Sequence, residues 1–141
     1  MKKSNVCIQR DASACGACSV KSIVSYYGGY IPLESALEDT NTNRVGTNAY
    51  YISRALKIYG FNSYGLKCNL DALNGLVKPL IAHTVIDGLE HFLVVYEINN
   101  KGILTMDPRV GKTIYSYDEF KSIFTGNVII AKPVGKIVRM T

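Results

Sequence analysis

Two cysteines near the start of the chain, Cys15 and Cys18 in the stretch QRDASACGAC, stand directly before a run of residues with helical spacing. A thiol at the N-terminus of a helix lies at the positive end of the helix dipole, which favours the thiolate. Such a thiol serves in three kinds of chemistry: a dithiol redox pair, a structural zinc site and nucleophilic catalysis. The remaining residues of the chain discriminate among these three.

The dithiol and the zinc site each lack a part in this sequence. A thioredoxin-type dithiol follows a buried strand, whereas residues 5–14 are polar and turn-like. A structural zinc ion takes four ligands, commonly as two closely spaced pairs. No second pair is formed by the other candidates, which are Cys7, Cys68, His83 and His91. We therefore expect no metal site, and we keep a thiol–disulfide oxidoreductase using Cys15 and Cys18 only as an alternative.

Nucleophilic catalysis by Cys15 requires a base and a group that orients this base. The chain has only two histidines, His83 and His91. His91 opens an apolar run, and Asp107 closes the next run along the chain. His83 lies in the middle of a run, and we interpret it as a surface or satisfied core residue. A helix-start cysteine, a later histidine and an aspartate together follow the logic of a catalytic triad.

The turn between the two runs decides whether His91 and Asp107 can meet. A three-residue loop over 99–101 pairs His91 with Arg109 and leaves Asp107 diagonal to His91 on the same face. A loop shorter by one residue sends Asp107 to the opposite face. Gly102 can take a positive φ and therefore favours the longer turn with a bulge. The geometry permits the triad without requiring it.

The elements that carry these side chains change from helical to extended along the chain. Apolar residues recur at helical spacing in residues 16–27, with Ser13 as a candidate N-cap. Further helices are predicted after Pro32, in residues 52–59, after Asn69 and near 118–124. Short runs rich in β-branched residues occupy 79–86, 91–98, 102–107, 112–117 and 127–133. This order predicts an α+β fold in which N-terminal helices pack on a C-terminal antiparallel sheet.

Length and composition fit one globular domain. The chain has 141 residues, of which 48% are hydrophobic. No apolar run approaches the ~20 residues that span a bilayer, and no apolar region of a signal peptide follows the first lysines. The net charge of +5 comes from scattered residues rather than from the basic stripe of a nucleic-acid-binding surface. We expect a soluble, cytosol-facing domain with reduced thiols and no nucleic-acid partner.

The order of these motifs resembles the papain-like cysteine peptidase domain at the N-terminus of peptide- and bacteriocin-exporting ABC transporters. The resemblance covers nearly the whole chain. It rests on four motifs in order: Gln-x5-Cys-Gly from Gln9, YYGG at 26–29, HFLVVYEI from His91, and Asp107-Pro108. Each motif alone is weak, but their order and spacing together are specific.

The resemblance implies a role for each matching residue. Cys15 corresponds to the nucleophile, His91 to the general base and later acid, and Asp107 to the residue that orients the imidazole. Gln9 corresponds to the oxyanion-hole glutamine, whose amide can donate beside the Cys15 backbone N–H. This chain has Ala14 where the family commonly has an acidic residue before the nucleophile. No substrate-binding residues are assigned.

The resemblance also implies a function and partners. Family members cleave a bacteriocin or another ribosomal precursor after a double-glycine leader and export the product through attached transmembrane and ATPase domains. We accordingly expect a single peptidase domain over residues 1–141, with a core at about 6–133 and a basic tail at 134–141 leading to a transmembrane domain. It would act on the cytoplasmic side of the bacterial plasma membrane without a cofactor, since ATP and Mg²⁺ belong to the ATPase domain. The alternative from another class is a non-catalytic module that binds the leader peptide without cutting it.

Overall fold

The helices occupy the first half of the chain, where the sequence predicted them. The computed structural model describes residues 1–140 and places α1 at Cys15–Tyr26, α2 at Leu33–Asp39 and α3 at Ala49–Ile58. The Asn48 side chain caps α3 by accepting a hydrogen bond from the Tyr51 backbone N–H at 3.0 Å. Short 3₁₀ helices lie at Lys3–Asn5, Ala12–Ala14 and Asp71–Gly75. Among residues 1–140, no helix combines the length and the apolarity needed to cross a membrane.

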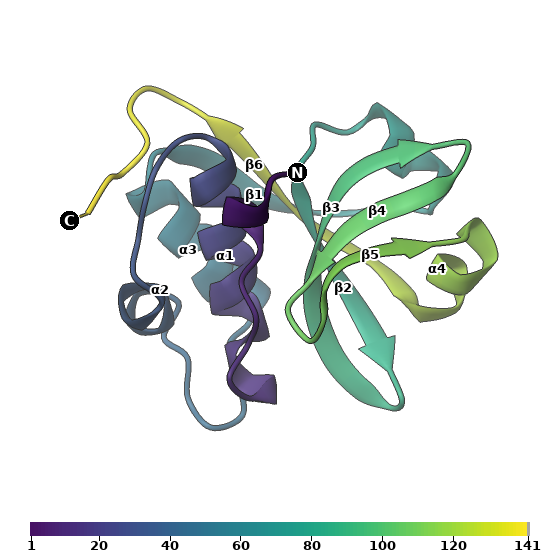
Figure 1. The fold of residues 1–141 in the computed structure, drawn as a ribbon, viewed down its shortest axis with the longest axis horizontal. Helices are drawn as coiled ribbons and strands as arrows, with labels where there is room; N and C mark the ends of the chain where they lie inside the picture. Colours follow the sequence, from purple (N-terminus) through teal and green to yellow (C-terminus); the bar gives the residue numbers. More distant parts are fainter. Residues whose placement is uncertain (141) are drawn as a thin grey trace.

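One antiparallel sheet of six strands forms the other half of the molecule (Figure 1). Its strands are β1 Phe61–Lys67, β2 Leu80–Ile86, β3 Leu89–Asn99, β4 Gly102–Asp107, β5 Gly111–Tyr115 and β6 Phe124–Pro133. They pair in the order β1-β6-β2-β3-β4-β5, and the helix α4, Tyr117–Ile123, connects β5 to β6. The α+β fold predicted from the sequence is confirmed, with α1, α2 and α3 gathered beside the sheet.

The edge strand β1 was not predicted. It follows α3 after Gly60 and pairs along its whole length with β6, from Phe61 opposite Pro133 to Lys67 opposite Asn127. Its sequence FNSYGLK has one glycine and no β-branched residue, so propensity alone does not indicate a strand. The pairing with β6, in which each partner lies at least 60 residues later, decides the conformation instead.

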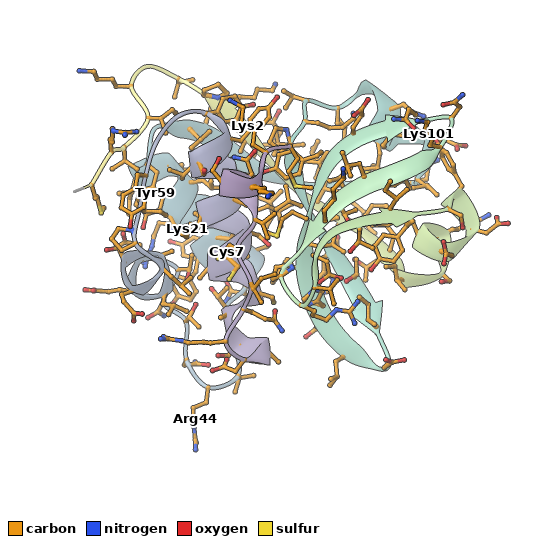
Figure 2. All side chains as sticks on the ribbon, in the orientation of Figure 1. Lys2, Cys7, Lys21, Arg44, Tyr59 and Lys101 are labelled. Atoms are coloured by element: carbon orange, nitrogen blue, oxygen red, sulfur yellow. The ribbon has the colours of Figure 1, made fainter. Side chains whose placement is uncertain are left out.

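The sheet buries a core on each of its faces. The larger core lies between the sheet and the three N-terminal helices and includes Ile23, Leu56, Phe92 and Met106. The smaller core lies on the other face, where Leu93 and Phe120 pack with residues of the 3₁₀ helix after β1. Figure 2 shows Cys7 beside α1 in the helical half and Lys101 at the far β3–β4 turn. Because successive strand residues alternate between these cores, each strand position has a defined face.

Residues 134–140 pass back over the helices. The Val138 backbone N–H donates to the Tyr59 carbonyl at 2.9 Å, and the Tyr30 N–H donates to the Val138 carbonyl at 3.1 Å. A Cβ at Gly29 would lie 2.4 Å from the Val138 oxygen, so the second glycine of the YYGG motif leaves room for this segment. Gly28 has a φ of 85° and ends α1 in a left-handed conformation.

Candidate active site

Cys15 is the first residue of α1, and the turn before the helix fixes its place. The Asp11 carboxylate accepts a hydrogen bond from the Ser13 backbone N–H at 3.0 Å and closes a 3₁₀ turn that runs into α1. The predicted N-cap at Ser13 is wrong, since α1 has no side-chain cap and Asp11 caps the preceding turn. The Cys15 side chain is buried, and its Sγ accepts a hydrogen bond from the Phe92 backbone N–H at 3.5 Å. The thiol therefore lies between the positive end of α1 and strand β3.

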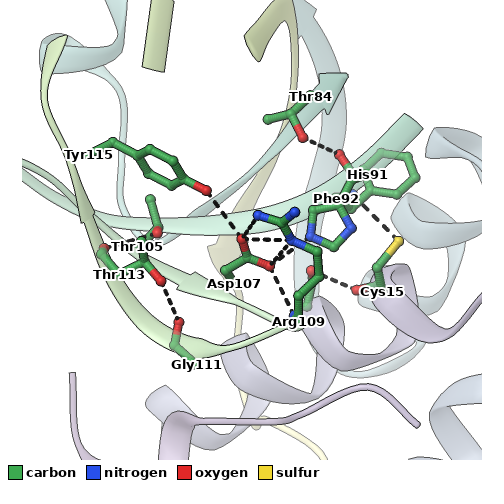
Figure 3. A network of polar contacts seen from close by, with 11 residues as sticks. Cys15, Thr84, His91, Phe92, Thr105, Asp107, Arg109, Gly111, Thr113 and Tyr115 are labelled. Carbon is green, nitrogen blue, oxygen red and sulfur yellow. Dashed lines mark hydrogen bonds and ion pairs between the residues drawn. The ribbon is translucent and has the colours of Figure 1, made fainter. Parts of the chain in front are cut away.

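His91 lies near the beginning of β3, with its ring between Cys15 and Asp107 (Figure 3). Its Nε2 is 2.8 Å from Asp107 Oδ1, and the ring also lies beside the Cys15 side chain. Burial lowers the pKa of His91, but the interactions with Asp107 and Cys15 outweigh burial and raise this pKa to about 9. The imidazolium is therefore the favoured form at neutral pH.

Asp107 ends β4 and is fully buried. Besides His91, its carboxylate accepts hydrogen bonds from the Arg109 backbone N–H at 2.9 Å, from Arg109 Nη2 at 2.9 Å and from the Tyr115 hydroxyl at 3.2 Å. Burial raises the pKa of the carboxyl, but the hydrogen bonds from His91 and Arg109 outweigh burial and hold this pKa well below its usual range. The sequence assigned no role to Arg109 and Tyr115, because their contacts depend on how β4 and β5 pair.

The turn between β3 and β4 is shorter than predicted. Asn99 pairs with Gly102, which leaves two residues in the turn instead of three. Because strand side chains alternate between faces, this pairing alone would put His91 and Asp107 on opposite faces of the sheet. The predicted three-residue turn is therefore wrong, and another feature has to align the two side chains.

A β-bulge at Tyr96 restores the alignment. The pairing of β3 with β4 shifts by one residue at this position, so Tyr96 is an extra residue in β3. Its hydroxyl lies 2.6 Å from Ser22 Oγ, which holds the bulge against α1. The net offset equals that of a three-residue loop, and His91 and Asp107 share one face as the longer turn would have placed them.

Gln9 lies in the segment between the first two 3₁₀ helices, next to the turn that follows β4. Its backbone N–H donates to the Pro108 carbonyl at 2.7 Å, which ties Gln9 to the residue after Asp107. Its side-chain Oε1 is buried and has no hydrogen-bond partner within residues 1–140. The backbone of Gln9 is therefore fixed beside the Asp107 turn, while its carboxamide oxygen makes no hydrogen bond to residues 1–140.

A cleft of about 420 Å³ opens beside Cys15. One wall is the loop that precedes α3, and a Cβ at Gly16 would lie 2.4 Å from Thr47 Cγ2 of that loop, so Gly16 permits their close approach. The opposite wall comes from β1, β2, β3 and β6. The polar lining residues are Thr47, Asn48, Lys67, His83, Glu90 and Asn127. The sequence assigned none of these residues to a binding site, because only the pairing of distant strands brings them together.

The second histidine, His83, lies on the wall of this cleft. Its Nδ1 is 2.9 Å from Thr125 Oγ1, and its Nε2 is 3.2 Å from Glu90 Oε1. Both ring nitrogens therefore have partners of their own, and the ring contacts Phe92 at a centroid distance of 5.2 Å. Of the two histidines, His91 is the one that lies beside Asp107 and Cys15.

The remaining cysteines contribute to packing. Cys18 is fully buried on α1 and lies against Cys7, whose thiol hydrogen bond, together with burial, raises the pKa of Cys18 far above its usual range. Cys68 is partly exposed, and all four cysteines are free thiols. Within residues 1–140, no three His, Cys, Asp or Glu side chains are grouped so that they could hold a metal ion.

Comparison with known proteins identifies the family to which this chain belongs. The model of the peptidase C39 family matches residues 3–136. LagD of Lactococcus lactis, a lactococcin-G-processing and transport ATP-binding protein, is 29% identical over 136 residues, which are 94% of this chain and 19% of LagD. The chain therefore spans about a fifth of the length of that relative.

Two solved structures share the fold over nearly their whole length. A double-glycine-motif protease from an AMS/PCAT transporter, in complex with the leader peptide, has a TM-score of 0.85 and 31% identity, covering 91% of this chain and 90% of that chain. The peptidase domain of Streptococcus ComA, a bifunctional ABC transporter involved in quorum sensing, has the same TM-score and identity, covering 91% and 97%. The papain-like peptidase fold expected from the motifs is confirmed.

Proposed function

Because this chain belongs to the peptidase C39 family, we propose that it is a cysteine endopeptidase that removes a double-glycine leader from a ribosomally made precursor peptide. The observation that carries the proposal is the buried arrangement of Cys15, His91 and Asp107, in which His91 contacts both other residues at the edge of a cleft. This arrangement supplies a nucleophile, a base and an orienting carboxylate.

In the proposed reaction, the Cys15 proton already resides on His91 in the free enzyme, and the thiolate of this ion pair attacks the carbonyl carbon of the second glycine. The Cys15 backbone N–H and the Gln9 carboxamide N–H donate to the oxyanion that forms. The imidazolium then gives its proton to the leaving amine, and the C–N bond breaks to leave a thioester on Cys15. The neutral imidazole takes a proton from water, whose oxygen attacks the thioester and releases the leader.

Specificity for glycine follows from the position of the thiol. Cys15 is buried and lies between α1 and β3, so a peptide carbonyl can reach it only where the flanking residues are small. Two glycines at the cleaved bond meet this requirement because they have no side chains. The related double-glycine-motif protease, solved with a leader peptide, supports the same substrate class here.

The proposed partners are the precursor peptide and the membrane and ATPase domains of an ABC transporter. LagD, which is named for both processing and transport, supports this arrangement because the chain matches a fifth of its length. The domain would then act on the cytoplasmic side of the membrane, and ATP would be used by the ATPase domain rather than by the peptidase.

The test is to incubate the protein with synthetic double-glycine precursors under reducing conditions and to follow the products by mass spectrometry. Wild type and Cys18→Ala should cut after the second glycine, whereas Cys15→Ala and His91→Ala should not cut. A matched precursor with leucines in place of both glycines should remain intact. Binding of the leader without cleavage by wild type would favour a docking module, and activity that needs Cys18 would favour a dithiol enzyme.

A further inference from the structure

The carboxylate of Asp107 is in contact with two cationic side chains. His91 Nε2 approaches Oδ1 at 2.8 Å, and Arg109 Nη2 approaches Oδ2 at 2.9 Å. Arg109 Nε is 3.2 Å from Oδ2 and 3.3 Å from Oδ1, so the guanidinium forms a fork that contacts both oxygens of the carboxylate (Figure 3). The Tyr115 hydroxyl adds a neutral donor to the same Oδ2 at 3.2 Å.

Arg109 can affect the site in two ways: its hydrogen bonds orient the Asp107 carboxylate, and its positive charge acts on the His91–Asp107 pair. Its backbone N–H, which any residue except proline provides, donates to Oδ1 at 2.9 Å, and Tyr115 donates to Oδ2. The orientation of Asp107 therefore has support that does not depend on the guanidinium. The positive charge of Arg109 has no such substitute, and it opposes the negative charge through which Asp107 stabilises a protonated His91.

We propose that Arg109 is a positioning residue that holds Asp107 and whose charge limits how strongly Asp107 stabilises the His91 imidazolium. The inference deepens the proposed peptidase function and rests on it for its consequence in cleavage. The proposal concerns the pH at which His91 loses its proton, and this pH can be measured without any substrate.

No other cationic side chain of the elements packed around His91 faces the His91–Asp107 pair within residues 1–140. From α1 the ring meets Cys15, and from β4 it meets Asp107, while Tyr115 of β5 reaches it only through the carboxylate. Glu90, the neighbour of His91 in β3, points to the opposite face by alternation and pairs with His83 at 3.2 Å. Arg109 is thus the cation that faces the His91–Asp107 pair from the turn after β4.

Nuclear magnetic resonance can titrate both histidine rings of the intact protein, because the chain has only His83 and His91. In Arg109→Gln we expect the His91 midpoint to rise by about half to one pH unit, since the lost charge is partly exposed and screened. His83 serves as the internal reference and should not move. An unchanged or lowered His91 midpoint would overturn the proposal, because a lowered one means that Asp107 has lost its place.

Three further variants separate charge from hydrogen bonding. Arg109→Lys keeps the charge without the fork, and Tyr115→Phe removes a neutral donor from the same oxygen, so both should leave the His91 midpoint within about 0.3 unit of wild type. Lys57→Gln removes an exposed charge on α3 and should change nothing. A rise in Arg109→Lys would overturn the role of the charge even if Arg109→Gln could not be obtained folded.

The same variants predict the pH dependence of cleavage. Loss of the Arg109 charge should move the alkaline limb of the kcat/KM profile to higher pH, by the same shift that the titration shows for His91. A site that had only become looser would have a lower kcat, but its alkaline limb would stay at the same pH. An alkaline limb that stays in place in Arg109→Gln would contradict the proposal. If wild type cut no precursor, the peptidase function would fail, and the titration would still decide the role of Arg109.

Discussion

Replacing Asp107 by asparagine removes one negative charge and keeps the shape of the side chain. In the native site both carboxylate oxygens accept hydrogen bonds, one from His91 Nε2 at 2.8 Å and one from Arg109 Nη2 at 2.9 Å. Asparagine has a single acceptor oxygen, so its NH₂ group has to face one of these two donors. We expect the pKa of His91 to fall, because the interactions that raise it weaken while the burial that lowers it remains.

The size of the effect on cleavage follows from this pKa. At pH 8, His91 with a pKa of about 9 is about 90% protonated, whereas a group at the ordinary 6.5 is about 3% protonated. With the imidazolium as the form that acts in the free enzyme, kcat/KM of Asp107→Asn at pH 8 should be about 30-fold below wild type. At pH 6, His91 is mostly protonated in both wild type and Asp107→Asn. The lower pKa of His91 alone should therefore reduce kcat/KM at this pH by less than about twofold.

The assay is cleavage of a synthetic double-glycine precursor, followed by mass spectrometry from about pH 5 to about pH 10. The matched control is Asp118→Asn, which removes the charge of an exposed aspartate in α4 and should keep the wild-type profile. Thermal unfolding of each variant shows whether the fold is retained. An equal loss of activity at every pH, with the alkaline limb of Asp107→Asn still near its wild-type position, would refute the reasoning.

Three other changes test the fold around the site. Gly29→Ala places a Cβ 2.4 Å from a backbone oxygen of the C-terminal segment and should lower the free energy of unfolding by about 1–3 kcal/mol in urea titrations, whereas Gly75→Ala meets nothing within 4 Å and should not. Tyr96→Phe removes the hydroxyl contact with Ser22 at 2.6 Å and should cost about 1–2 kcal/mol of stability, and an unchanged urea midpoint would contradict this. Because His91 has a folded pKa of about 9 against an ordinary 6.5, its contribution to stability is complete below pH 6.5 and is lost as the pH rises through 9. The free energy of unfolding should decline over that range in wild type, and His91→Gln should remove this part of the decline.

The helices and most strands could be predicted because their evidence is local. The spacing of apolar residues indicates α1, and the β-branched runs indicate β2 through β6. Strand β1 gives no such signal, since FNSYGLK is a strand only because β6 lies beside it. The candidate catalytic residues could also be predicted, because the chain has only two histidines that could serve as the base for Cys15.

The details of the site depend on contacts that the sequence does not encode locally. The turn length was predicted wrongly, although the alignment of His91 with Asp107 was expected from the longer turn. Neither the bulge at Tyr96 nor the fork of Arg109 has a sequence signature, because each depends on a neighbouring element. The cleft walls likewise combine segments that are far apart in the chain.

The bulge at Tyr96 and the β3–β4 turn lie on the same side of the catalytic pair. His91 and Asp107 lie beyond the bulge, and their alignment depends only on the pairing there, which includes Val95 opposite Thr105. A residue added to or lost from the turn leaves that pairing unchanged as long as the strands keep their partners. A residue inserted into β3 between His91 and the bulge, or into β4 just before Asp107, would instead turn one of the two side chains to the other face. Related chains should therefore vary in the length of the turn but not in the number of residues in these two strand segments.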